Sequence, residues 1–285
     1  MPEFEKRFTP DGDQVPFPSE NDVLFEPDDG FAWITLNRPL ILNAVDWSVR
    51  RGLARALTQA SQADDVRAVV LRGAGRAFSA GGDLQAWPEP EDGVETPGMV
   101  DLVGRIWSLP KPVIAAVRGP AVGLGFELAG VCDLTIAADD AKLGEIQIRH
   151  GFGPPILIAP FLAGFKGAKE ILMLGDILTA EDAQRLGIVN RIVPSEAVFD
   201  EAAAMAKKFA ALPVATVGLN KALVNRVYEL VGVREALDYR SDAKLEALFD
   251  RTRDDDLAAE RLRVLESDGW DAFIKKRDEA FGGGS

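Results

Sequence analysis

The chain has 285 residues, 47% of them hydrophobic, which is enough apolar material to build a buried core. Its formal net charge of -13 and its pI near 4.7 argue against partners such as nucleic acid or an anionic membrane, because both would be repelled. The charged residues 1–14 lack an apolar core, so we expect no secretory signal, and no apolar run approaches membrane-spanning length. The single cysteine, Cys132, cannot form an internal disulfide, and we expect a small core residue in a cytoplasmic protein.

The first part of the chain predicts an arm, a strand and a helix in that order. Residues 1–20 contain Pro, Asp and Glu without periodicity, and they predict a flexible N-terminal arm. The apolar segment 31–37 (FAWITLN) predicts a strand. Residues 48–61 carry apolar side chains at helical spacing, and Asp46 stands at the position of an N-cap. We therefore expect a helix that begins after Asp46 and ends near residue 61.

Three further apolar runs predict strands at residues 66–72, 112–117 and 134–138. Their apolar residues are continuous rather than alternating, which is typical of strands covered on both faces.

The chain changes character near residue 196, where long helical patterns replace the strands. We expect a mixed α/β core over residues 21–195 and a helical C-terminal region over residues 196–281. Residues 87–97, rich in Pro, Glu and Asp, predict a surface loop that could border a site. The last four residues, 282–285 (GGGS), predict a flexible tail.

Two glycine-containing turns carry the chemical signal of this sequence. Residues 75–84 (GRAFSAGGDL) and 118–133 (RGPAVGLGFELAGVCD) each follow a strand, and the second turn leads into an apolar helix. The amino terminus of a helix offers unpaired N–H groups and a positive dipole end. A thioester that is deprotonated at its α-carbon, or attacked at its β-carbon, gathers negative charge on its carbonyl oxygen. Two N–H donors would stabilise that enolate, and loss of one such donor costs ~3 kcal/mol.

The spacing of the second turn also places a carboxylate near these donors. Glu127 follows Leu124 by three positions, so both lie on the same face of the predicted helix. A general base or acid acting on the α- or β-carbon must lie there. The alternative is that Glu127 is an ordinary solvated helix residue, but its neighbours are apolar.

At these two turns the chain resembles the crotonase, or enoyl-CoA hydratase/isomerase, family, and the resemblance extends from about residue 22 onward. The resemblance implies a crotonase-like ββα superhelical core with a helical C-terminal trimerisation region. It also implies a homotrimer or a dimer of trimers, an acyl-CoA thioester substrate, and no metal or redox cofactor. The motifs that carry it are residues 36–45 (LNRPLILNAV), 78–84 (FSAGGDL), 111–133 (KPVIAAVRGPAVGLGFELAGVCD), 175–194 (GDILTAEDAQRLGIVNRIVP) and 269–281 (GWDAFIKKRDEAF).

The resemblance also assigns roles to individual residues. The backbone N–H groups of Ala80 and Leu124 should form the oxyanion hole, and Glu127 matches the first of the two catalytic glutamates of hydratases. Ala80 and Leu124 are also expected to contact coenzyme A, together with Gly81, Asp83 and Leu84. Phe273 and Lys276 of the terminal motif should approach its adenine and phosphate, often from a neighbouring subunit.

Departures from the family pattern bear on the type of reaction. The second glutamate of the family falls at Gln147, and an amide cannot transfer protons in the ordinary way. Glu145 would lie on the same face of an extended strand as Gln147, so it is either a substitute for the missing acid or a solvated surface charge. His150, the only histidine, is either a proton shuttle or a structural residue. Leu40 replaces a basic residue of the family, so other cations must bind the coenzyme A phosphates.

Enoyl-CoA hydration or dehydration is the first function that these residues predict. Double-bond isomerisation is second, because one carboxylate can remove a proton and return it elsewhere, and thioester hydrolysis or carbon–carbon cleavage is third. A non-catalytic acyl-CoA binder is the alternative from another class.

Two other enzyme classes are weaker alternatives. The G-x-G pairs at 73–75 and 123–125 lack the third glycine of a dinucleotide site. Ser79 lacks the first glycine of a serine-hydrolase elbow, because Ala77 stands there, and its triad would have to recruit His150.

Overall fold

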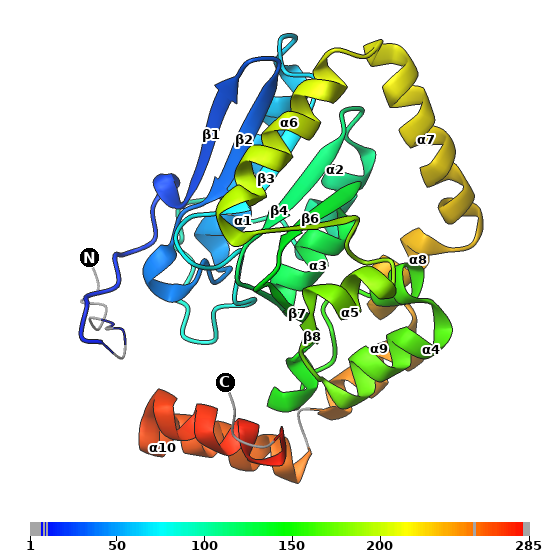
Figure 1. Cartoon of the computed structure of the whole chain (residues 1–285). Helices are drawn as coiled ribbons and strands as arrows, with labels where there is room; N and C mark the ends of the chain where they lie inside the picture. Colours follow the sequence, from blue (N-terminus) through cyan, green and yellow to red (C-terminus); the bar gives the residue numbers. More distant parts are fainter. Residues whose placement is uncertain (1–6, 8, 10, 253–254, 282–285) are drawn as a thin grey trace.

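A six-stranded sheet forms the centre of the computed structural model, which describes residues 7, 9, 11–252 and 255–281 (Figure 1). The first two strands pair antiparallel, and all other neighbours in this sheet are parallel. The strands predicted at 31–37, 66–72, 112–117 and 134–138 are present, so these predictions are confirmed. In sheet order the strands are β1 (Val23–Asp28), β2 (Phe31–Leu36), β3 (Val69–Gly73), β4 (Val113–Val117), β6 (Leu134–Ala138) and β9 (Arg191–Val193).

A second, three-stranded sheet stands beside the first and consists of β5 (Pro120–Val122), β7 (Lys142–Gly144) and β8 (Leu178–Thr179). Two isolated parallel bridges extend the strand contacts, one between Ser79 and Ala121 and one between Val45 and Gly82. The Ser79–Ala121 bridge holds the two glycine-containing turns next to each other, and this contact positions the candidate site.

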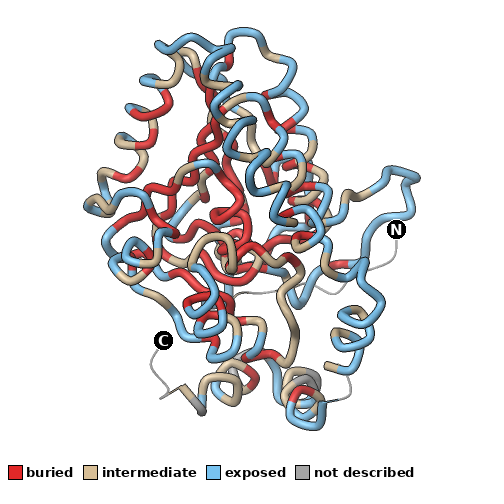
Figure 2. Tube along the Cα trace, turned by 90° about the vertical axis from the view of Figure 1, so that its right-hand side faces the viewer, coloured by how far each residue is buried: buried red, intermediate tan, exposed pale blue. Residues whose placement is uncertain are grey.

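Helices cover both faces of the large sheet (Figure 1). The helix α6 (Val198–Ala210) packs on one face, whereas α1 (Trp47–Gln62), α2 (Met99–Ser108) and α3 (Leu124–Val131) lie on the other. The carboxylate of Asp46 accepts hydrogen bonds from the backbone N–H groups of Ser48 and Val49, which confirms the predicted N-cap. Figure 2 shows the buried residues running through the sheet and the helices that face it.

The rest of the described chain is mostly helical, as expected for the C-terminal region. Helix α10 bends at Gly269, whose φ of 83° is not helical. The remaining α-helices are α4 (Ala159–Leu174), α5 (Ala180–Arg185), α7 (Val214–Leu230), α8 (Val233–Leu237), α9 (Ala243–Arg251) and α10 (Asp256–Asp278). Short 3-10 helices are η1 (Glu20–Asp22), η2 (Pro39–Ile41), η3 (Gln147–His150), η4 (Ser195–Ala197), η5 (Tyr239–Ser241) and η7 (Glu279–Phe281).

Two features differ from the sequence expectations. The antiparallel strand β1 was not predicted, because Pro27 and the acidic residues around it weaken the strand pattern. The segment at Glu145 and Gln147 was expected to be an extended strand, and this is wrong. Strand β7 ends at Gly144, and Gln147 begins η3, whose C-cap Gly151 adopts a left-handed conformation with φ of 84°.

Other described segments bear on earlier expectations. Cys132 is buried, and the loop predicted at residues 87–97 is exposed over 88–95, while Trp87 at its start is buried. Within the predicted arm, Arg7 pairs with Asp83 at 2.7 Å, and Val15 is 3% exposed. Residues 1–6, 8 and 10 of the arm and the predicted tail, 282–285, lie outside the described residues. No single described helix is long and apolar enough to cross a membrane. Residues 195–210 and 214–230 meet that test only as a pair bent by 109°.

Candidate active site

The two glycine-containing turns predicted from the sequence touch each other. A Cβ atom added to Gly81 would lie 2.7 Å from the Val122 carbonyl oxygen and 3.4 Å from the Leu124 amide nitrogen. A Cβ on Gly125 would lie 2.4 Å from the carbonyl oxygen of Ser79. Side chains at these positions would clash with the opposite backbone, so glycine is required for the close approach.

The proposed oxyanion donors differ in availability. Leu124 is the first residue of α3, and its N–H is one of the helix N–H groups without an intrahelical acceptor. The N–H of Ala80 donates to the carbonyl oxygen of Leu42 at 2.8 Å. Leu42 and Asn43 both have positive φ, at 52° and 56°, which is uncommon for non-glycine residues. A substrate oxygen would therefore find Leu124 open and would share the Ala80 donor with Leu42.

Glu127 lies in α3 and is completely buried, with 0% exposure. Its Oε1 atom accepts hydrogen bonds from Gln147 Nε2 at 3.3 Å and from the Ile156 N–H at 3.4 Å. Its Oε2 atom has no hydrogen-bond partner among the described residues. Burial raises the pKa of Glu127 well above 4.5, and the nearby Glu145 carboxylate raises it further. The alternative that Glu127 is a solvated helix residue is therefore wrong, while its catalytic role stays a prediction.

Glu145 is also buried, with 2% exposure, so the alternative that it is a solvated surface charge is wrong as well. Within the described chain neither of its carboxylate oxygens has a hydrogen-bond partner. Burial raises the pKa of Glu145 to about 8, against a smaller lowering by the Gln147 side chain. The site thus contains two buried carboxylates near each other.

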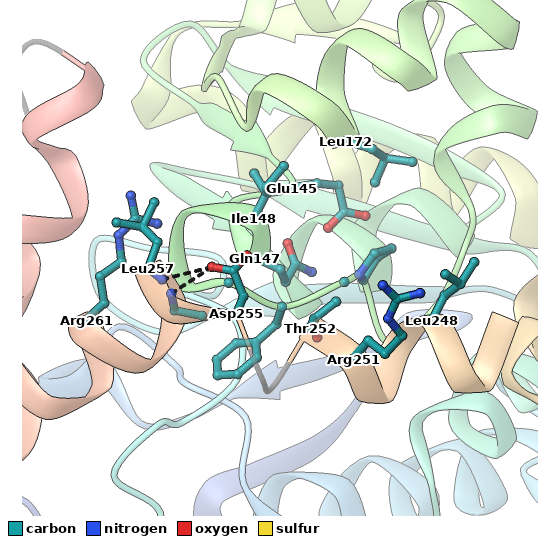
Figure 3. Close-up of a pocket in the computed structure, with 15 residues that line it drawn as sticks. Glu145, Gln147, Ile148, Leu172, Leu248, Arg251, Thr252, Asp255, Leu257 and Arg261 are labelled. Carbon is teal, nitrogen blue, oxygen red and sulfur yellow. Dashed lines mark hydrogen bonds between the residues drawn. The ribbon is translucent and has the colours of Figure 1, made fainter.

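A cavity of about 600 Å³ opens beside Glu145, and the described residues that line it do not include Glu127 (Figure 3). Glu145 and Gln147 line one wall, and both side chains reach toward the middle of the space. The opposite wall comes from α9, from the start of α10 and from the segment between them. It contains Leu248, Arg251, Thr252, Asp255, Leu257, Ala258 and Arg261. The Gln147 side chain also reaches the second glycine-containing turn, since a Cβ atom added to Gly123 would lie 3.6 Å from the Gln147 side-chain amide.

His150 lies next to this cavity in sequence but not among the described residues that line it. The residue is 8% exposed, and its ring stacks on Phe273 with the ring centroids 5.6 Å apart. Arg277 Nη1 lies 3.4 Å from His150 Nε2. Burial, with help from Arg277, lowers the pKa of His150 to about 4, so the ring is neutral at pH 7. These contacts favour the structural role of His150 over the proton shuttle.

The expected coenzyme A contacts are only partly gathered at the turns. Gly81 lies against Leu124, and Leu84 is 39% exposed nearby in sequence. The side chain of Asp83 is instead buried in ion pairs with Arg7 at 2.7 Å and Arg38 at 3.4 Å. Its position indicates a structural role.

The two C-terminal residues expected at coenzyme A also have partners within this chain. Phe273 is 0% exposed and packs on His150. Lys276 pairs with Glu260 and with Glu279, both at 3.4 Å. Contacts of Phe273 and Lys276 with a nucleotide, from this or a neighbouring subunit, stay predictions.

Some residues at the site had no sequence signal. Tyr239 donates its hydroxyl to the Pro154 carbonyl oxygen at 2.6 Å, and burial raises its pKa to about 12. Arg251 and Arg261 lie outside the motifs named above, so nothing in the sequence connects them with the distant glycine turns. In the described residues, no group of three His, Cys, Asp or Glu side chains is placed to hold a metal ion.

Comparisons with known proteins give consistent matches. A family model described as enoyl-CoA hydratase/isomerase matches residues 26–283. A probable enoyl-CoA hydratase of Mycobacterium bovis is 32% identical over 263 residues, which cover 91% of this chain and 97% of that protein. The 1,2-epoxyphenylacetyl-CoA isomerase of Escherichia coli is 32% identical over 271 residues, which cover 92% and 98%. The crystal structure of an enoyl-CoA hydratase/isomerase from Xanthobacter autotrophicus superposes with a TM-score of 0.80 and 36% identity, covering 91% of this chain and 98% of that one.

Proposed function

The chain belongs to the enoyl-CoA hydratase/isomerase family, within the crotonase superfamily, and on this premise we propose that it adds water to, or removes it from, an acyl-CoA thioester. One observation carries the proposal. The buried carboxylate of Glu127 stands in the first turn of α3, the helix whose leading N–H group belongs to Leu124. A proton-transferring group and an enolate-stabilising donor are thereby combined on one short element.

In the hydration direction, the thioester carbonyl oxygen is held by the N–H groups of Leu124 and Ala80. Glu127 removes a proton from water while the water oxygen bonds to the β-carbon, and the electrons of the double bond move onto the thioester as an enolate. Protonation of the α-carbon then gives the 3-hydroxyacyl product. The donors act on the enolate more strongly than on the neutral substrate, so they lower the barrier.

Double-bond isomerisation is the second candidate. It needs one carboxylate to take a proton from one carbon and return it to another, which suits a site with Gln147 in place of the second glutamate. One solved structure that resembles this chain, at 30% identity and with a TM-score of 0.60, is titled a monofunctional enoyl-CoA isomerase from M. smegmatis.

The test is turnover of a panel of saturated, 2-enoyl- and 3-enoyl-CoA thioesters in deuterated water, analysed by mass spectrometry. A product that gains water identifies a hydratase, and a deuterium-labelled shifted alkene identifies an isomerase. Glu127→Gln should lower kcat at least about 100-fold with little change in affinity, and Glu181→Gln, at an exposed position of α5, is the matched control. Binding without any turnover would instead identify an acyl-CoA binder.

We further propose that the chain assembles as a homotrimer or a dimer of trimers. Helix α7, at one side of the molecule, carries a row of exposed apolar side chains three or four positions apart (Figure 1). A row of this kind is typical of a surface that a partner covers. Its members are Leu219, Leu223, Val227 and Leu230, each at least 56% exposed. Sedimentation should show a trimer or hexamer for the wild type and a smaller species for Val227→Glu.

The remaining proposals concern conditions of action. We propose that the protein acts in the cytoplasm on a free acyl-CoA, and that it uses neither a metal nor a redox cofactor. Coenzyme A is part of the substrate, and backbone N–H groups can stabilise the enolate. The net charge of -13 argues against nucleic acid and anionic membranes as partners. Turnover that survives exhaustive chelation would support the metal-free mechanism.

A further inference from the structure

We propose that Glu145 is the second proton-transferring residue of this site and that it acts on the α-carbon of the acyl group. This inference rests on the proposed function and deepens it, because the family position for that residue is occupied by Gln147.

The first argument is the state of the Glu145 carboxylate. The side chain is 2% exposed, and neither oxygen has a partner among the described residues, although burial of an unpaired carboxylate is costly. The same side chain lines the cavity of about 600 Å³, and Figure 3 shows it directed into that space. A substrate in the cavity would supply the missing contact.

The second argument is the orientation of Gln147 between the two carboxylates. Its Nε2 donates to Glu127 Oε1 at 3.3 Å, while its Oε1 is buried and has no partner in the described structure. Gln147 is thus a positioning residue that holds Glu127 in its charged form, while its side chain lowers the pKa of Glu145 by less than burial raises it.

The third argument is electrostatic. Glu127 and Glu145 are close enough that each disfavours ionisation of the other in a buried site, so the pair retains one proton at neutral pH. Two N–H groups, from Gln147 and Ile156, point at Glu127 and stabilise its charged form. Neither oxygen of Glu145 has a hydrogen-bond partner in the described chain, and burial outweighs the lowering of its pKa by the Gln147 side chain, so the shared proton belongs on Glu145.

The step balances as follows for hydration. Glu127 takes a proton from water as the bond between the water oxygen and the β-carbon forms. The enolate then takes the proton of Glu145 at the α-carbon, which forms the new C–H bond and leaves Glu145 as a carboxylate. Glu127 now holds one proton and Glu145 none, and transfer of that proton back to Glu145 restores the pair.

The experiment measures two reactions of wild type and Glu145→Gln. The first is hydration of but-2-enoyl-CoA, and the second is exchange of the α-hydrogens of butanoyl-CoA with deuterated water, which requires no addition of water. We expect Glu145→Gln to lower both rates at least about 100-fold, with butanoyl-CoA affinity within about threefold of wild type. Glu145→Gln/Gln147→Glu, which moves the carboxylate to the family position, should recover at least about tenfold of the lost hydration. Glu181→Gln is the matched control.

The outcomes separate this inference from the proposed function. If the wild type exchanges α-hydrogens but hydrates no enoyl-CoA, and Glu145→Gln stops the exchange, the hydratase proposal fails and the role of Glu145 stands. If Glu145→Gln keeps both rates within about threefold, Glu145 has no role in proton transfer. Loss of butanoyl-CoA affinity in that variant, or absence of both reactions in the wild type, would also overturn the inference.

Discussion

The buried Glu145 should make the stability of this protein depend on pH in an unusual direction. Its folded-state pKa of about 8 lies above the ordinary value of 4.5, so Glu145 stays protonated to a higher pH in the folded chain than in the unfolded chain. The stabilising contribution is fully present below pH 4.5 and is lost as the pH rises through 8. Most carboxylates in salt bridges do the opposite.

The size of the effect follows from the two pKa values. At about 1.4 kcal/mol for each pKa unit, the wild type should lose about 4 kcal/mol of unfolding free energy between pH 5 and pH 9. About 1.4 kcal/mol of this loss should fall between pH 7 and pH 9.

The assay is urea unfolding of wild type and Glu145→Gln at pH 7 and pH 9, followed by tryptophan fluorescence at one fixed protein concentration. This window lies above the titration of His150, so that residue does not contribute. Glu145→Gln should gain stability relative to wild type as the pH rises. An equal difference at both pH values, or a difference of opposite sign, would show that Glu145 is not held in its neutral form.

Three other changes test separate parts of the structure. Burial lowers the pKa of His150 to about 4, so this residue destabilises the folded chain as the pH falls below 6.5. Between pH 7 and pH 4.5, the unfolding free energy of His150→Phe, measured in urea, should therefore fall by about 2 to 3 kcal/mol less than that of the wild type. Asn43 is buried and bonds to Arg38, Ala74 and Ala77, so Asn43→Ala should cost about 2 to 4 kcal/mol, and a shift of the urea midpoint below half of that contradicts this view. Gly123 has φ of 55°, so Gly123→Ala should cost about 1 to 3 kcal/mol and lower kcat more than it raises KM, whereas unchanged kinetics would argue against Leu124 as a donor.

Local patterns predicted much of the fold. The continuous apolar strands, the Asp46 cap and the two glycine turns depend on residues close together in the chain, and the structure contains all of them. The α/β fold and the family resemblance were confirmed for the same reason, since the motifs that carry the family are short and local. The strand β1 was missed because its pairing with β2, rather than its own composition, stabilises it.

Local patterns predicted the residues of the candidate site less well. Spacing alone placed Glu127 beside Leu124, but it gave the wrong local structure for Glu145 and Gln147, because the left-handed Gly151 closes a 3-10 helix there. The burial of Glu145 depends on the fold around it, which one segment of sequence does not reveal. For the same reason, the sequence offered both a shuttle and a structural role for His150, and only the stacking on Phe273 favours one of them.

The cavity draws its two walls from regions about 100 residues apart in the chain, with Glu145 and Gln147 on one side and residues 248–261 on the other. The first wall carries Glu145, which we propose transfers a proton, and the second faces it with leucine, threonine and arginine side chains. On the proposed function, we expect substitutions in α9 and in the first turns of α10 to change the fit of the acyl group without moving Glu145. Substrate preference and reactivity would then be separate traits, and each could be changed without the other.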